Sequence, residues 1–281
     1  MERPSAAAAS NQMPLLADLD VPTPPQWRKT LRLVATVGAV SLGSSFQFGF
    51  GTGSLNNLEE VAPRTLAEDG RPCTLLQWSI VVSGFGVGGL VGSMLVALVT
   101  HAFGRKTVLL ASNGLVLASS CLLIGGDSWP LLFLGRVCIG IVAGIAAGVV
   151  PMYFADLAPT ALRGAVGTAH QLSITMGTFV AQLLTTPSLE LVGSDTRWRY
   201  TFAVPLICSA IECAILPTCP ESPAYLYRMG GSTAALRKLV ELHTAGSISD
   251  HIDSMRAEHT FALSESGARR RRRRRHRRHA L

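Results

Sequence analysis

Polar but uncharged side chains interrupt two of the long apolar runs in this sequence. They are Gln47, Thr52 and Asn56 in the first run, and His170, Gln171, Ser173 and Thr175 in a later one. Amide and hydroxyl groups form hydrogen bonds without adding charge, and beside an apolar wall they suit a neutral ring of hydroxyls better than an ion. The pattern therefore favours a site for a sugar, although Gln171 alone fits a hydrogen bond between helices equally well.

The apolar runs have the length and composition of membrane-spanning helices. The chain of 281 residues is 48% hydrophobic and 15% charged, well below the charge content typical of a soluble domain. A bilayer core requires about 20 consecutive apolar residues from a helix. Six runs predict six transmembrane helices: Leu31–Gly51, Leu76–Val99, Thr107–Gly125, Leu131–Ala155, Ala165–Thr186 and Tyr200–Pro217.

Two ionisable side chains lie inside these predicted spans. Arg136 is early in the fourth and Glu212 is in the sixth. Ionisable groups at membrane depth normally face protein or a water-filled cavity, which makes both residues functional candidates. Each also lies close enough to an end of its span for the side chain to reach the membrane surface, and the sequence leaves this alternative open.

Basic residues flank alternate ends of the spans and predict their orientation. Lys and Arg are retained on the cytoplasmic side, and most of those beside the spans fit one arrangement: Arg28, Lys29, Arg32, Arg105, Lys106, Arg163, Arg228, Arg237 and Lys238. Arg197 and Arg199, before the sixth span, run against it. We expect a multi-pass protein of the plasma membrane with both termini cytoplasmic.

The remaining segments divide the chain further. Residues 1–26 predict a disordered cytoplasmic leader, residues 27–217 a six-helix transmembrane domain, and residues 218–262 amphipathic helices under the membrane. Residues 263–281 form an Arg-rich tail that suits anionic lipid but lacks aromatic residues for reading bases, so no specific nucleic-acid partner is predicted. The abrupt change in composition at the tail favours an alternative exon end over a binding function.

Cysteine and glycine spacing indicates packing and not chemistry. The six cysteines show no close metal-ligand spacing, so we predict no metal, no other cofactor and no catalytic residue. Glycines recur at intervals of four in the second and fourth spans, where they let neighbouring backbones approach closely: Gly84, Gly88 and Gly92, then Gly140, Gly144 and Gly148.

Four ordered motifs identify a family. They are GRVCIGIVAGIAAGVVPMYFADLAPTALRGAVGTAHQ (135–171), SSFQFGFGTGSLN (44–56), FGRK (103–106) and PESP (220–223). Over about Leu31–Tyr227 the chain resembles the amino-terminal six-helix half of the facilitative glucose transporters, in the sugar-porter branch of the major facilitator superfamily. The resemblance implies an all-α membrane fold of 3+3 inverted repeats, without the second six helices.

The resemblance also implies roles for individual residues. The sugar-contacting positions of the family match Gln171, Ile174, Thr178, Phe48 and Asn56. The charged positions that hold the outward-open state at the cytoplasmic ends match Arg105, Asp156, Arg163 and Glu221. The family usually has Glu at the position of Asp156, which implies a weaker ion-pair network in this chain.

Gly51 is the departure that bears most on mechanism, because proton-coupled relatives have an Asp there. We expect facilitative (uniport) hexose transport by alternating access, without enzymatic activity, from a truncated half-carrier. Its expected partners are a hexose, the lipid bilayer and either a second carrier half or a second copy. The alternative is a non-transporting membrane fragment that associates with full-length carriers and regulates them.

Overall fold

A computed structural model describes residues 25–68, 71–189, 192–193 and 197–229. Residues 31–222 form one compact unit, and residues 1–30 with 223–281 belong to a second. The predicted leader up to residue 24, the predicted amphipathic segment beyond residue 229 and the Arg-rich tail lie outside the described residues. Of the second unit, the described part includes the short helix α11 (Pro223–Arg228).

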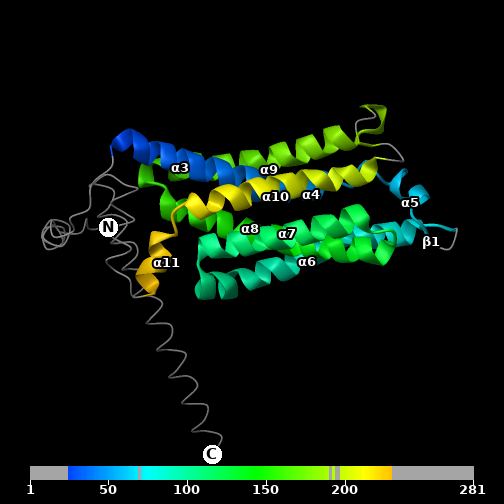
Figure 1. Cartoon of the computed structure of the whole chain (residues 1–281), viewed down its shortest axis with the longest axis horizontal. Coiled ribbons are helices and arrows are strands. Elements are labelled where there is room, and N and C mark those ends of the chain that lie inside the picture. Colours follow the sequence, from blue (N-terminus) through cyan, green and yellow to red (C-terminus); the bar gives the residue numbers. More distant parts are fainter. Residues whose placement is uncertain (1–24, 69–70, 190–191, 194–196, 230–281) are drawn as a thin grey trace, which may run out of the picture. The chain divides into compact units, whose positions relative to one another are not determined.

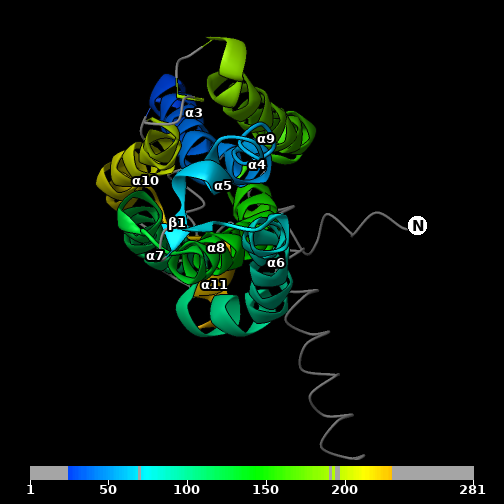
Figure 2. The same ribbon diagram turned by 90° about the vertical axis from the view of Figure 1, so that its right-hand side faces the viewer.

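A helix lies at each of the six predicted spans, and the six run side by side in both views (Figures 1 and 2). The first span comprises α3 (Gln26–Val40), a π-helical turn η1 (Ser41–Ser45) and α4 (Phe46–Gly53). The next four are α6 (Leu75–Phe103), α7 (Arg105–Gly125), α8 (Trp129–Leu157) and α9 (Arg163–Thr185). The sixth consists of α10 (Ala203–Ile215) between the 3₁₀ turns η4 (Trp198–Phe202) and η5 (Leu216–Thr218).

Five of these spans are long and apolar enough to cross a membrane, and α9 is the one that falls short on composition. Its 23 residues are sufficient in length, because a helix rises about 1.5 Å per residue and a span needs about 20 residues. Its hydropathy is lowered by the polar side chains noted in the sequence. The least apolar of the six spans is therefore the one that carries the candidate glutamine, Gln171.

Helices α6 and α8 interlock through the two glycine series. A Cβ on Gly88 would meet the carbonyl oxygen of Val137, and a Cβ on Gly144 would meet that of Gly89. The glycines of each helix thus leave a groove that is filled by the backbone of the other helix, and no larger residue would leave this groove open. The prediction of close backbone approach is confirmed, because at these positions even a methyl group would displace the backbone of the neighbouring helix.

One end of the bundle, called here the Trp78 end, has its own hydrophobic core. It is built from the 54–74 segment, which includes α5 (Ala62–Thr65) and the antiparallel strands β1 (Ala67–Glu68) and β2 (Arg71–Pro72). Trp78 and Trp198 meet edge to face there, and Trp198 Nε1 donates to Thr65 Oγ1 at 2.8 Å. A capping box between Thr74 and Gln77 begins α6.

The opposite end, called here the Gly104 end, contains the FGRK motif. Gly104 joins α6 to α7 with φ of 80°, in the region that favours glycine. The chain reverses between the two helices at this residue. The turn presents Arg105 and Lys106 at the start of α7, where the candidate charged cluster forms.

Candidate functional site

Helices α4 and α9 pack closely enough to bring three candidate residues together. A Cβ on Gly49 would meet the carbonyl oxygen of Ile174, and one on Gly177 would meet that of Phe46. Thr178 Oγ1 donates to the Gly49 carbonyl oxygen at 3.1 Å. The segments that carry Phe48, Ile174 and Thr178 are therefore in direct contact, and all three side chains are half-buried.

Gln171 lies one turn before Ile174 on α9, and its side chain is exposed. Its amide forms no hydrogen bond to any residue that the structure describes, so it is not bonded to a neighbouring helix there. Thr175, one turn further, is exposed as well and donates only to the Gln171 carbonyl oxygen within the helix. Helix α9 thus presents an exposed amide at Gln171 that is not hydrogen-bonded to any described residue.

Asn56 is separated from these residues and lies at the Trp78 end. Its neighbour Asn57 donates to the carbonyl oxygen of Gln182 at 3.0 Å, which places this segment eleven residues along α9 from Gln171. At about 1.5 Å per residue, the two sites are roughly 16 Å apart along the helix. The structure therefore does not bring Asn56 to the same place as Gln171.

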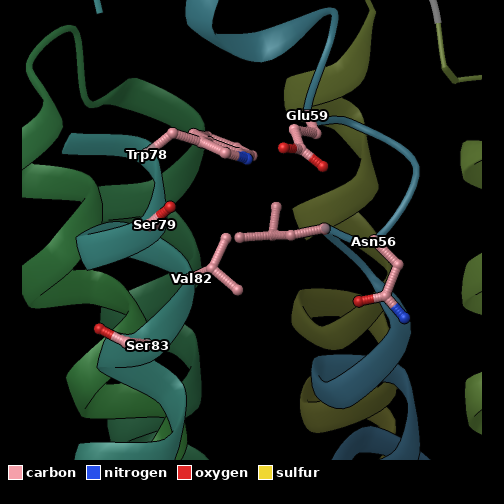
Figure 3. Close-up of a pocket in the computed structure, with 7 residues that line it drawn as sticks. Asn56, Glu59, Trp78, Ser79, Val82 and Ser83 are labelled. Atoms are coloured by element: carbon pink, nitrogen blue, oxygen red, sulfur yellow. The ribbon is translucent and has the colours of Figure 1, made fainter. Parts of the chain in front are cut away.

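Asn56 instead lines a pocket of about 400 Å³ between the 54–61 segment and α6 (Figure 3). Figure 3 shows the indole nitrogen of Trp78 directed toward the pocket, with the Glu59 carboxylate on the facing side. The remaining lining residues are Leu55, Ser79, Val82 and Ser83. A carboxylate, an amide and hydroxyls beside an aromatic ring could hydrogen-bond a polyhydroxylated ligand at this end of the bundle.

Arg136 is buried inside the bundle, with 2% of its surface exposed. Its Nη1 donates to the Gly51 carbonyl oxygen at 2.9 Å and to Ser54 Oγ at 3.4 Å, and the guanidinium lies 4.8 Å from the Phe85 ring centroid. Glu212 is fully buried as well. The alternative that these two side chains reach the membrane surface is therefore wrong.

Phe85 is a residue that sequence reasoning missed. Its ring stacks on Phe48 at 6.4 Å and 26°, and it receives the Arg136 cation on its face. Phe85 thereby connects the candidate sugar-facing aromatic residue to the buried cation. The only sequence signal was an aromatic residue placed between Gly84 and Gly86, where small neighbours leave room for a large ring.

At the Gly104 end, Arg105 and Asp156 form an ion pair. Arg105 Nε lies 3.2 Å from Asp156 Oδ2, and the two side chains are 4% and 18% exposed. The Ser222 hydroxyl donates to the same carboxylate oxygen. Two of the four predicted charged residues are therefore joined directly, on α7 and α8.

Glu221 joins this cluster by hydrogen bonds to backbone groups. Its Oε1 accepts from the Lys106 backbone N–H at 3.1 Å and from that of Ser222 at 3.0 Å. A carboxylate at the first turn of α7 also interacts favourably with the helix dipole. Arg163, the fourth predicted residue, is exposed at the first residue of α9.

The fold is a bundle of six helices with an exposed amide, that of Gln171, on one of them. Residues 35–280 match the family described as "Sugar (and other) transporter", and this chain belongs to that family. The match extends beyond Tyr227, where the resemblance was expected to end.

The curated relatives are glucose transporters. The mouse (Mus musculus) facilitated glucose transporter member 4 of solute carrier family 2 is 34% identical over 252 residues, which are 84% of this chain and 49% of the relative. Member 3 from Bos taurus is 39% identical over 210 residues, which are 70% of this chain and 42% of the relative. The chain thus spans about half the length of the curated relatives it matches.

Solved structures give the same fold. The proton:xylose symporter XylE of the major facilitator superfamily, bound to 6-bromo-6-deoxy-D-glucose, has a TM-score of 0.73 at 21% identity, covering 85% of this chain and 56% of that one. XylE from E. coli in a partially occluded inward-open conformation has a TM-score of 0.62 at 25% identity, covering 80% and 56%. The expected fold, a six-helix half of the major facilitator architecture, is confirmed.

Proposed function

We propose that this chain is the amino-terminal half of a facilitative hexose carrier that works by uniport. Sugar-porter folds of this kind place the substrate near the bilayer midplane between two six-helix halves, and transport results from the rocking of one half against the other. This half contributes one wall of the site, from α4 and α9. Both chain termini lie on the cytoplasmic side in this proposal, with the carrier in the plasma membrane.

The observation that carries the proposal is the exposed amide of Gln171. A polar group left toward hydrocarbon costs several kcal/mol, so a membrane helix keeps such a group for a partner or for water. Gln171 and Thr175 lie one turn apart on α9, and the adjoining α4 carries Phe48, whose ring stacks on Phe85 of α6. Amide, hydroxyl and aromatic groups are the set that a neutral sugar requires.

The buried environment of Arg136 supports uniport over proton coupling. Its guanidinium binds a backbone carbonyl, that of Gly51, and neither ion pair among the described residues includes it. A proton-coupled carrier needs a carboxylate whose protonation changes during the cycle. Gly51 offers no side chain for that purpose.

The charged cluster at the Gly104 end is proposed to hold the outward-open state. Arg105 and Asp156 tie α7 to α8, while Ser222 and Glu221 tie the segment after α10 to both helices. These contacts connect elements from different parts of the half-domain. In this proposal they brace the cytoplasmic end of this half in the outward-open state.

The test is reconstitution in liposomes with labelled glucose and fructose. The 281-residue chain is compared with the same chain joined to the second six-helix half of a full-length relative. We expect saturable, stereospecific uptake from the joined protein only, because a single half has nothing to close against its site. Joined protein that reaches the membrane but takes up both enantiomers of glucose equally would refute the proposed function.

The second candidate is a non-transporting fragment that associates with full-length carriers. It is favoured by the unsatisfied polar side of α9, which two chains or a chain and a carrier could cover together. Co-reconstitution with a full-length relative separates the candidates. A regulatory fragment lowers or raises the relative's uptake at fixed relative concentration, whereas the isolated carrier half leaves it unchanged.

A further inference from the structure

The first span is not a uniform α-helix, because η1 inserts one π-helical turn between α3 and α4. The Phe46 backbone N–H bonds to the carbonyl oxygen of Ser41, five residues earlier. An α-helix has 3.6 residues per turn, so each residue accounts for about 100° of rotation. The extra residue absorbed by the π turn therefore shifts every later residue of α4 by one position.

This shift decides which residues of α4 face α9. Gly49 and Gly53 face it, and a Cβ on Gly49 would meet the Ile174 carbonyl oxygen. In an uninterrupted α-helix Phe48 would take the place of Gly49, and Thr52 that of Gly53. Neither larger residue fits those places against the α9 backbone, so the observed packing of α4 on α9 requires the π turn.

Two adjacent serines of the turn are held by two different helices. Ser44 Oγ donates to the Glu212 carboxylate of α10, with distances of 2.9 and 3.0 Å to its two oxygens. Ser45 Oγ lies 2.7 Å from His170 Nδ1 of α9. A Cβ on Gly43 would meet the Glu212 carboxylate, so the turn offers this side chain both a space and a hydrogen-bond donor.

The surroundings of Glu212 supply hydrogen bonds and not an opposite charge. The residue is fully buried, and neither ion pair among the described residues includes it. Both carboxylate oxygens of Glu212 accept from Ser44, and one turn earlier on α10 Ser209 donates to Asn113 Oδ1 of α7 at 2.9 Å. A neutral side chain of the same shape would therefore fit the site as well as a carboxylate.

We propose that Glu212 is a positioning residue, which holds the π-helical turn of the first span through Ser44 and so determines which side chains of α4 face the substrate. Phe48 and Thr52 face away from α9 only while the turn persists. The consequence for hexose binding rests on the proposed function, whereas the effect on the α4 register does not.

Disulfide cross-linking between α4 and α9 directly measures which residues of α4 face α9. The Cβ position of Gly53 lies 3.2 Å from Ala181 Cβ, near the separation that a disulfide spans. In the full chain, with its natural cysteines replaced, Gly53→Cys with Ala181→Cys should form a disulfide under mild oxidation, and Thr52→Cys with Ala181→Cys should not. Mass spectrometry of the linked peptide identifies which pair has formed.

Glu212→Ala should abolish the cross-link from position 53, because the turn reverts to an α-helix and position 53 rotates away from Ala181. Glu212→Gln should retain the parent pattern. Ser209→Ala is the matched control: it removes a buried hydrogen bond from the same helix without touching the first span, and should lower the melting temperature without changing the cross-link. If Glu212→Ala does not fold, Ser44→Ala decides by the same criterion. The proposal would be overturned if the position-53 cross-link were unchanged in Glu212→Ala or, where that variant does not fold, in Ser44→Ala. This outcome does not depend on whether hexose binds.

Discussion

The Arg136 guanidinium donates a 2.9 Å hydrogen bond to the backbone carbonyl of Gly51, 85 residues earlier in the chain. The cation is thus partnered by a group that cannot change its protonation state. Because no carboxylate is available at position 51, we predict that a carrier containing this half, joined to a suitable second half, moves hexose only down its gradient. An inward proton gradient should not drive accumulation in proteoliposomes.

The control for this first prediction is the proton:xylose symporter in the same vesicles, which should respond to the gradient. Uphill hexose uptake that a protonophore abolishes would contradict uniport and the assignment of Gly51. Equal initial rates with and without the gradient would support both.

Gln171→Ala should weaken hexose binding in the joined carrier without blocking membrane insertion. The loss of one hydrogen-bond partner in a desolvated site costs about 1–3 kcal/mol, or roughly 5- to 150-fold in affinity. The matched control is Gln182→Ala, another exposed glutamine of α9, which lies eleven residues away and should leave affinity unchanged. Equal affinities with reduced expression of the Gln171 variant would make this residue structural.

Gly88→Ala should destabilise the bundle, because the added methyl group would meet the Val137 backbone carbonyl. Overpacking of this kind costs about 1–3 kcal/mol. Gly86→Ala, on the same helix, meets nothing within 4 Å and should be neutral or stabilise by about 0.5–1 kcal/mol. Thermal unfolding in detergent measures both. Similar melting temperatures for the two variants would show that α6 and α8 do not pack as described.

Asp156→Asn should destabilise the Gly104 end by about 1–3 kcal/mol, because Arg105 is almost fully buried and loses its counter-charge. Asp127→Asn is the matched control, since Asp127 is 90% exposed in its ion pair with Arg199 and surface pairs contribute little. Thermal unfolding compares the two variants. An equal loss of stability in both would mean that burial does not govern this ion pair.

The proposed orientation predicts opposite labelling at two exposed positions. In a background without other cysteines, Glu60→Cys should react with an impermeant thiol reagent on intact cells, and His101→Cys should react only after permeabilisation. Both residues are exposed in the structure, so accessibility alone does not separate them. Labelling of His101→Cys and not of Glu60→Cys in intact cells would reverse the topology.

Much of the fold could be predicted from the sequence, because membrane helices satisfy their backbone hydrogen bonds within the segment. Six apolar runs of the right length therefore indicated six helices, and glycines at intervals of four indicated two helices that a neighbouring backbone can approach closely. Arg105 and Asp156 became candidates in another way, through the resemblance of two motifs to a known family, and the structure then showed that the two form an ion pair. Nothing in the sequence alone indicates that these two residues are in contact.

The directions of side chains within the spans were decided only by the tertiary structure. Gln47 and Gln171 are the same residue type in similar runs, yet Gln47 is 6% exposed while Gln171 is exposed. Arg136 and Glu212 likewise fitted either a buried or a surface position until their partners were known. Hydropathy measures how apolar a run is, but not which of its sides meets protein.

The sequence by itself determined the number, length and chemistry of the helices, since these depend on neighbouring residues and on the bilayer. The π turn at Ser41–Ser45 depends instead on Glu212, which is 168 residues from Ser44 in the chain. The register of α4 is set by the hydrogen bond between Ser44 and Glu212 of another helix, and by the Ile174 carbonyl, which leaves no room for a side chain at Gly49. No local sequence pattern predicts a register that depends on such distant residues. For this reason the tertiary structure alone decided which face of the first span is available to a substrate.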